Sequence, residues 1–189
     1  MIAVVDESMR SGAGSLYLVA TVMVPERPTQ VQEIQEVIRS IPVPGQHRFH
    51  WRPDSESQRL AMLALIAELG LVARAYVLQP VVTHRQDRAR ALCVNRLLWD
   101  LGELGVDQVV FESREEHNDR KDRLTVLRAQ KATRAPDQLR YVFRRPNEEP
   151  LLWLADAMAG AVSARFGDDD EHYLQALDPD QVRVVTVVP

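Results

Sequence analysis

The stretch that decides the fold is MIAVVDES, residues 1–8, an apolar run that ends in two carboxylates and a hydroxyl. Apolar residues at successive positions are typical of a central strand that is covered on both faces. Because alternate side chains of a strand point to opposite faces, Asp6 should lie on the face of Val4 and Glu7 on the other. Ligands of α/β sheets gather at the carboxyl ends of strands, so Asp6 is well placed for chemistry. The alternative is that Asp6 opens the turn that follows.

The composition is ordinary for a soluble globular protein. The chain has 189 residues and a net charge of -4, with 46% hydrophobic and 26% charged residues, so we expect residues 1–189 to form a single domain. The lone Cys93 excludes an intrachain disulfide and fits a reducing compartment, which favours a cytoplasmic location. The N-terminal apolar run is too short for a signal peptide. No stretch approaches the ~20 apolar residues of a membrane span.

Strand-like and helix-like segments alternate along the rest of the chain. After a turn at residues 9–14, apolar β-rich runs predict strands at 16–24, 72–82, 106–111, 139–144 and 182–188. Helical spacing of apolar residues, with capping and stop signals, predicts helices at about 29–41, 54–69, 84–105, 113–133 and 151–165. In the charged helix at 113–133, Leu124 and Leu127 are the expected apolar anchors. This order predicts an α/β fold, a mixed β-sheet with helices on both faces.

Two further carboxylates stand in unexpected places. Glu112 follows an apolar strand just as Asp6 does, although it could instead pair with Arg114 or cap a helix. Asp156 lies in the middle of LLWLADAMAGAV, residues 151–162, a helix that is apolar almost all round and is therefore expected to be buried. A buried lone carboxylate costs several kcal/mol unless it is paired or bound to a cation. The position of Asp156 therefore calls for a partner.

Two strand-end carboxylates and one on a packed helix are what a Mg²⁺ or Mn²⁺ site needs. Such hard ions take oxygen ligands and keep several waters for a phosphate substrate. Asp6, Glu112 and Asp156 are accordingly the candidate metal ligands. The competing explanation for Asp156 is a salt bridge to a buried arginine, such as Arg144 or Arg145.

The chain resembles the bacterial "domain of unknown function 3800" family in four short segments. These are DES at 6–8, FH at 49–50, ESR at 112–114 and LADAMAGA at 154–161. The resemblance extends from residue 2 to about residue 166. The family is assigned to the ribonuclease H-like superfamily, which includes retroviral integrases and Holliday-junction resolvases.

The resemblance implies a ribonuclease H-like mixed β-sheet and two-metal hydrolysis of phosphodiester bonds. In that superfamily one Asp ends the first strand, a second acid ends a later parallel strand, and a third lies on the C-terminal helix. Asp6, Glu112 and Asp156 match these three places. One departure is Met9, because the family usually has Gly after Asp-Glu-Ser.

A cluster of aromatic, imidazole and guanidinium groups, HRFHWR, occupies residues 47–52. His50, and also His47, could bind metal, act as a general acid or base, or contact phosphate, although a loop histidine more often does none of these. Glu7 or His50 could supply a fourth ligand or move a proton. Trp51 stays open as a platform on which a base could stack.

Basic residues gather in the segment 120–145, where nine Lys or Arg stand against two Asp, a local charge of +7. Backbone phosphates supply most non-specific affinity for nucleic acid, so a basic face beside an acidic metal site is typical of a nuclease. The candidate substrate-binding residues are Arg114, Arg48, Arg120, Lys121 and Arg123. The alternative is a solvated helix face with acidic neighbours.

The leading hypothesis is therefore a nuclease that acts on DNA or RNA with two Mg²⁺ or Mn²⁺ ions held by the three carboxylates. A second hypothesis is a catalytically inactive ribonuclease H-like module that binds nucleic acid or protein. A third is a hydrolase of a small phosphorylated molecule, which would not need the basic segment. The apolar strand at 182–188 could pair between two chains at an exposed sheet edge and form a homodimer.

Overall fold

The described residues of this computed structural model, 1–12, 15–42, 48–81 and 85–188, contain one six-stranded mixed sheet. Its strands are β1 (Ile2–Arg10), β2 (Leu16–Val24), β3 (Val72–Leu78), β4 (Gln108–Glu112), β5 (Arg140–Arg144) and β6 (Val182–Thr186). They lie in the order β5-β4-β1-β2-β3-β6. The β1–β2 and β2–β3 pairs are antiparallel, whereas β4 is parallel to β1, β5 to β4 and β6 to β3. The predicted mixed α/β sheet is confirmed.

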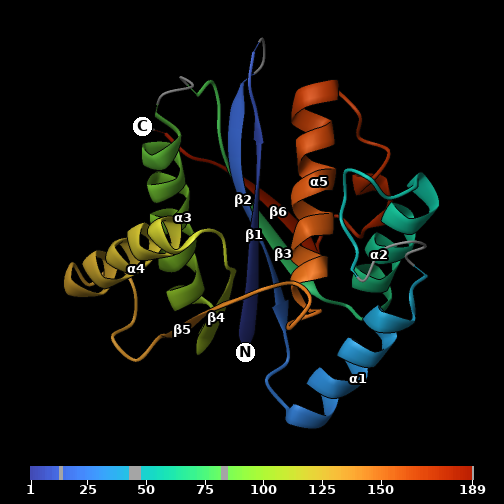
Figure 1. Ribbon diagram of the computed structural model, residues 1–189, viewed down its shortest axis with the longest axis horizontal. Coiled ribbons are helices and arrows are strands. Elements are labelled where there is room, and N and C mark those ends of the chain that lie inside the picture. The colour runs from blue at the N-terminus through green and yellow to red at the C-terminus, as the bar shows by residue number, and fades with distance from the viewer. Residues whose placement is uncertain (13–14, 43–47, 82–84, 189) are drawn as a thin grey trace.

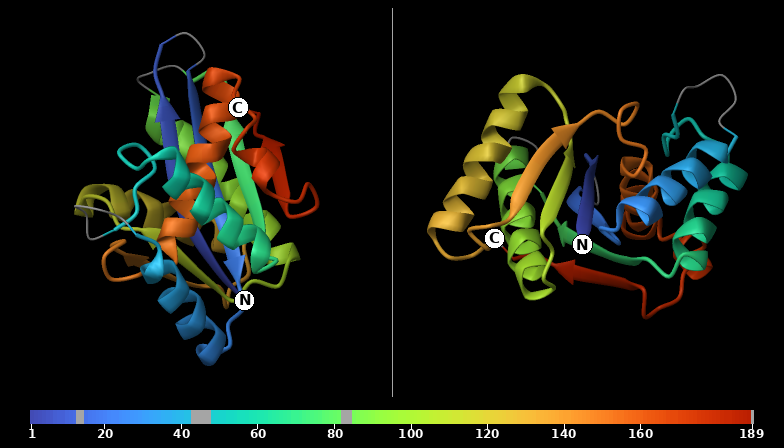
Figure 2. Two further views of the ribbon diagram at one scale, coloured as in Figure 1. Left: turned by 90° about the vertical axis from the view of Figure 1, so that its right-hand side faces the viewer. Right: turned by 90° about the horizontal axis from the view of Figure 1, so that it is seen from below.

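Helices cover both faces of this sheet (Figures 1 and 2). The helices are α1 (Pro28–Ser40), α2 (Glu56–Glu68), α3 (Gln86–Glu103), α4 (Glu116–Lys131) and α5 (Leu152–Asp168), with a short 3-10 helix at Leu174–Ala176. α1, α2 and α5 share one buried cluster with Val4 of β1, while α3 and α4 share the other with Ala3 and Val5. The alternation of side chains along β1 therefore decides which layer each of its residues meets.

β1 continues beyond the point at which the sequence predicts a turn. Its pairing with β2 extends from Ile2 to Arg10, so Met9 and Arg10 belong to the strand. Its pairing with β4 stops earlier, at Val5 opposite Phe111. Asp6 thus lies in the strand where β1 leaves β4, and the alternative that Asp6 opens the turn is wrong.

A local sequence signal accounts for the start of α2. Ser55 is the N-cap of α2 and forms a capping box with Gln58. The Ser55 hydroxyl accepts a hydrogen bond from the backbone N–H of Gln58, and the Gln58 side chain accepts one from the backbone N–H of Ser55. α5 is buried along nearly its whole length, as its apolar composition predicts. In the described residues no helix is both long enough and apolar enough to cross a membrane.

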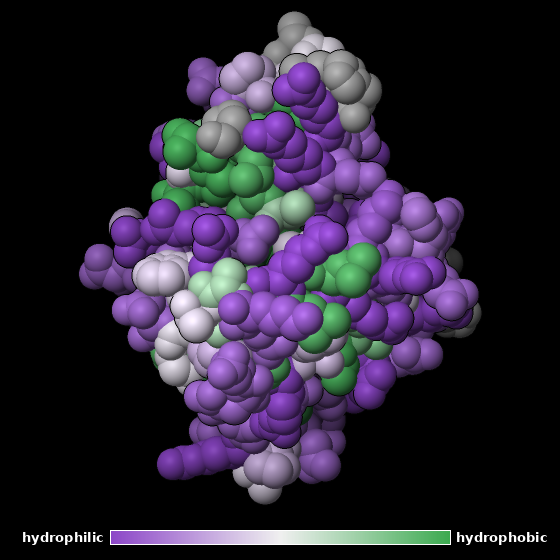
Figure 3. Space-filling model, turned by 90° about the vertical axis from the view of Figure 1, so that its left-hand side faces the viewer, coloured by the Kyte–Doolittle hydropathy of each residue, from purple (hydrophilic) through white to green (hydrophobic). Residues whose placement is uncertain are grey.

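The anchors of α4 differ from the prediction. Val126 and Ala129 pack inward, whereas Leu124 and Leu127 are each 44% exposed. The reason is that the inward stripe of α4 also carries acidic side chains that bond to arginines, which shifts the helix face that is buried. Apolar areas interrupt a mainly hydrophilic surface on the side of the molecule shown in Figure 3.

Candidate metal-binding site

Three carboxylates from three separate elements line one cavity of about 230 Å³. Asp6 comes from β1, Glu112 from the end of β4, and Asp156 from the middle of α5. Asp6 and Glu112 follow Val4 and Val110 in the alternation along their strands, and both valines pack in the cluster that contains α5. The fold thus brings together the three carboxylates that the sequence singled out.

The carboxylates repel one another. Burial first, and then the neighbouring charges of Glu112 and Asp156, raise the pKa of Asp6 well above its usual value. The Asp6 carboxylate accepts a hydrogen bond from the backbone N–H of Glu7 at 2.7 Å. The positive charge of Arg90 lowers the pKa of Asp6 but is the weakest of these influences. The protein alone therefore favours a proton on Asp6, and a cation would relieve the same repulsion.

Asp156 is held by the segment that precedes α2. Its Oδ2 atom lies 3.1 Å from His50 Nδ1 and accepts a hydrogen bond from the backbone N–H of Trp51 at 3.1 Å. The hydrogen bond to Asp156 raises the pKa of His50, although burial opposes it. Both bonds go to Oδ2, so within the described residues Oδ1 is the oxygen left for another ligand. The predicted alternative, a salt bridge to Arg144 or Arg145, is not found there.

Glu112 is fixed through the residues that follow it. Ser113 donates from its hydroxyl to Asp119, and the backbone N–H of Arg114 donates to the same carboxylate, at 2.7 and 2.9 Å. Asp119 lies in the first turn of α4, so the start of α4 holds the loop that directly follows Glu112. The Glu112 carboxylate lies 3.6 Å from Arg48, and its predicted alternative partner Arg114 points elsewhere.

Glu7 also borders the cavity of the three carboxylates, but its own carboxylate is turned to the opposite face of the sheet, as the alternation predicts. Its carboxylate forms ion pairs with Arg90 and with Arg114, the latter at 3.2 Å. Asp122 completes this network, with oxygens 2.8 Å from Arg90 Nε and 3.1 Å from Arg114. The Glu7 carboxylate is therefore held by two arginines in this structure. Arg114 is likewise committed to these two acids rather than to substrate.

The other predicted substrate-binding residues fall in two places. Arg48 lines the cavity of the three carboxylates. Arg120, Lys121 and Arg123 lie on α4, which covers the opposite face (Figure 2). Lys121 pairs with Asp87 of α3, and the guanidinium of Arg123 lies 5.0 Å from the centre of the Phe143 ring. His47 lies outside the described residues.

Three features of the site escaped the sequence prediction. The Trp51 backbone bonds to Asp156, Gly160 lets the Trp51 indole lie against α5, and Arg90 is buried beneath β1. A Cβ at Gly160 would overlap the indole ring, so only glycine allows this approach. A signal for Arg90 does exist: it lies beside Ala89 on an apolar helix face, where an arginine needs an acidic partner. The contacts of Trp51 and Gly160 depend on tertiary packing and have no local signal.

The chemistry of the cavity fits a hard divalent cation, since the carboxylates of Asp6, Glu112 and Asp156 supply oxygen ligands, although Arg48 and Arg52 also line it. In the described ranges, no three His, Cys, Asp or Glu side chains are yet arranged as a metal-binding group. Ligation by all three carboxylates would therefore require side-chain rotation. The shared cavity and the repulsion at Asp6 are the observations in favour of a cation.

The sheet order β5-β4-β1-β2-β3, with β2 alone antiparallel to its neighbours and α5 packed over the acids, defines a ribonuclease H-like α/β fold. A chain of the solved PCNA:RNase HII complex from Archaeoglobus fulgidus is similar to this chain at 19% identity and a TM-score of 0.47. The match covers 95% of this chain and 82% of that chain. The fold class rests on strand order and direction rather than on this likeness. No protein-family model matches the chain, and no curated protein matches it.

Proposed function

We propose that this protein is a Mg²⁺- or Mn²⁺-dependent phosphodiesterase that cleaves nucleic acid. The observation that carries the proposal is the convergence of Asp6, Glu112 and Asp156 on one cavity from β1, β4 and α5. Carboxylates that repel one another in a partly buried cavity favour a divalent cation over an empty site. Arg48 at the cavity wall adds a cation that can contact a phosphate oxygen.

The side chains of the cavity would divide the work as follows. Asp6, Glu112 and Asp156 would hold the ions, which when bound activate a water and stabilise the leaving oxygen. His50 Nδ1 shares a proton with Asp156 Oδ2 and fixes the orientation of that carboxylate. Because the same hydrogen bond raises the pKa of His50, this imidazole would hold its proton to a higher pH than a free histidine.

The choice of substrate rests on the ribonuclease H-like fold and on the cations around the site. The segment resemblance supports membership of the "domain of unknown function 3800" family and a single domain over residues 1–189. DNA and RNA are both compatible with a phosphodiester-binding site. The competing function, a binding module without catalysis, would bind nucleic acid whether or not metal or Asp156 is present.

The experiment is a Mn²⁺ titration by calorimetry on the wild type, Asp6→Asn, Asp156→Asn and the matched control Asp137→Asn. Asp137 is an exposed aspartate outside the cavity. We expect micromolar binding in the wild type and in the control, and its loss in the two cavity variants. Cleavage of labelled DNA and RNA by Asp6→Ala and Asp156→Ala should be abolished while circular dichroism stays unchanged.

The alternatives give different results. Equal Mn²⁺ binding in all four proteins, or cleavage that survives in both alanine variants, would refute the proposed site. Binding of nucleic acid that ignores both metal and Asp156→Asn would identify the binding module instead.

A further inference from the structure

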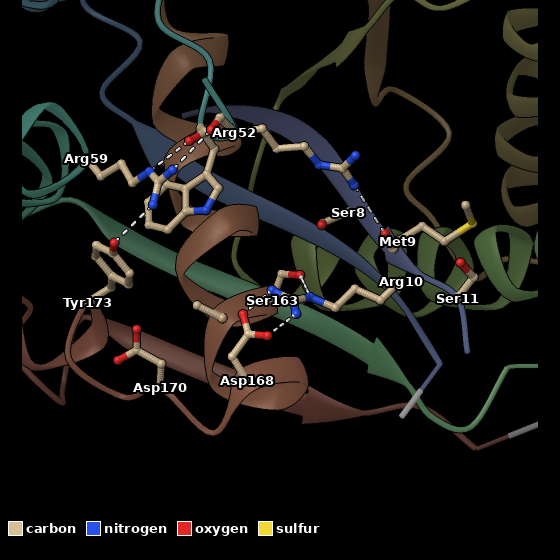
Figure 4. Close-up of a pocket in the computed structure, with 12 residues that line it drawn as sticks. Ser8, Met9, Arg10, Ser11, Arg52, Arg59, Ser163, Asp168, Asp170 and Tyr173 are labelled. Atoms are coloured by element: carbon tan, nitrogen blue, oxygen red, sulfur yellow. Dashed lines mark hydrogen bonds and ion pairs between the residues drawn. The ribbon is translucent and has the colours of Figure 1, made fainter. Parts of the chain in front are cut away.

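A second cavity, of about 550 Å³, adjoins the carboxylate cavity. Four residues line both cavities: Ser8, Met9, Trp51 and Arg52. The two therefore form one groove that runs along the end of β1 and between the 48–52 segment and α5. Figure 4 shows the second cavity and its polar lining.

Arg52 lies where the two cavities meet, and its guanidinium makes few interactions with the rest of the protein. Within the described residues its guanidinium donates one long hydrogen bond, 3.4 Å, to the backbone oxygen of Met9. Arg52 is exposed and bears no ion pair in that part of the chain. A guanidinium carries five N–H donors in a planar fork that suits two oxygens of a phosphate. Most of these donors remain free to meet an anion.

Arg10 supplies a second guanidinium from the floor of the groove. It donates to Ser163 at 2.9 Å and to both oxygens of Asp168 at 2.5 and 2.6 Å, which uses three of its five N–H groups. Figure 4 shows the Ser8 hydroxyl between the guanidinium groups of Arg52 and Arg10. Ser8 and Arg10 lie on one face of β1 because they are two residues apart in a strand.

The Trp51 indole on the far wall of the second cavity is packed against three neighbours. The Arg59 guanidinium lies 5.1 Å from the centre of the Trp51 ring, and the Tyr173 ring meets it edge-on with centres 4.7 Å apart. Gly160 lies against the same indole. Trp51 is thus packing for the groove rather than a platform for a base. The ligand of this cavity must be recognised by its charge.

We propose that Arg52, with the Ser8 hydroxyl and Arg10, binds a backbone phosphate of the nucleic-acid strand next to the phosphate that enters the carboxylate cavity. This inference rests on the proposed function and adds the path of the substrate. The nucleic-acid strand would follow the groove on the α5 face of the sheet. The basic face of α4 is not part of this path because it lies on the opposite side.

The test is binding of fluorescent single-stranded DNA and RNA oligonucleotides in Ca²⁺, which holds oxygen ligands with looser geometry than Mg²⁺. Anisotropy is measured over a range of salt concentrations for the wild type, Arg52→Ala, Arg52→Lys and Arg183→Ala. Arg183 is a matched control, an exposed arginine on the edge strand β6. Because Arg52 is also exposed, both of its variants should fold, and circular dichroism checks this.

We expect Arg52→Ala to bind about tenfold more weakly and to lose about one unit of the salt slope, since one phosphate contact disappears. Arg52→Lys should fall between it and the wild type, because lysine keeps the charge but not the fork. Arg52→Ala should still bind Mn²⁺ like the wild type. If Arg52→Ala binds the oligonucleotides like Arg183→Ala, the phosphate site is wrong and the proposed function stands. A wild type that binds Mn²⁺ but neither oligonucleotide would overturn both.

Discussion

Replacing Asp6 by asparagine should stabilise the metal-free protein while removing its response to metal. Asp6 and Glu112 line the same cavity, and burial and the neighbouring charges of Glu112 and Asp156 raise the pKa of Asp6. Two unit charges ~4 Å apart at an effective dielectric constant of about 20 repel by about 4 kcal/mol. That figure is a ceiling, because the wild type avoids part of the repulsion by keeping a proton on Asp6. For a chain of 189 residues the ceiling corresponds to a rise in Tm of about 8–16 °C.

The gain in stability of Asp6→Asn over the wild type should grow as the pH rises. The native carboxyl of Asp6 holds its proton more tightly than the unfolded one, so this group stabilises the fold at low pH. That contribution is lost as the pH rises from the ordinary carboxyl pKa through the raised one. We therefore expect Asp6→Asn and the wild type to be similar below the ordinary carboxyl pKa, and the variant to become increasingly more stable as the pH rises towards the raised pKa of Asp6.

Metal should offset much of this difference in stability. Mn²⁺ at about a hundredfold its Kd stabilises a one-site protein by about 2.7 kcal/mol, or roughly 5–11 °C in Tm at this chain length. We expect this shift in the wild type and in Asp137→Asn, and none in Asp6→Asn. Thermal unfolding followed by circular dichroism, with and without Mn²⁺, measures both effects. The reasoning is refuted if the pH profiles of the wild type and Asp6→Asn coincide in the absence of metal.

Three further perturbations test the supports of the site. Gly160→Ala should push the Trp51 indole out of its position and lower the free energy of unfolding by about 1–3 kcal/mol. Urea titration measures this change, and an unchanged unfolding midpoint would contradict the packing argument. Glu7→Gln should lower the free energy of unfolding by ~1–3 kcal/mol, because it weakens the contact with Arg90, and it should leave Mn²⁺ affinity unchanged. Loss of Mn²⁺ binding in the folded variant would show that Glu7 is a metal ligand. Burial raises the pKa of Cys93 to about 12, so at mildly alkaline pH iodoacetamide should modify this thiol only at the rate of unfolding. Rapid modification of the native protein would instead show that the thiol is accessible.

Local sequence signals were sufficient for the elements and for the three carboxylates. The capping box at Ser55 and the alternation along β1 are properties of neighbouring residues, and the structure follows both. The family resemblance added the expectation that Asp6, Glu112 and Asp156 belong together, and one cavity contains all three.

The positions of the arginine and lysine side chains relative to the site depend on information that the local sequence does not carry. The charge run on α4 is plain in the sequence, but the side of the sheet on which α4 packs depends on how the chain crosses over after β4. Arg114 follows Glu112 directly and still turns to the other face, because Glu7 and Asp122 hold it there. Arg52 looks like any loop arginine until the groove beside it is known.

The pairing of β1 has a consequence for the identity of the site. Val4 and Val5 are both buried, so a slip of β1 by one residue would leave the apolar core almost as well filled. The same slip would turn Glu7 toward α5 and Asp6 toward Arg90. The register that places Asp6 opposite Ala20 is therefore selected by polar partners on the two faces, above all by the buried guanidinium of Arg90, which forms an ion pair with the Glu7 carboxylate. Which acid enters the cavity is decided on the other side of the sheet.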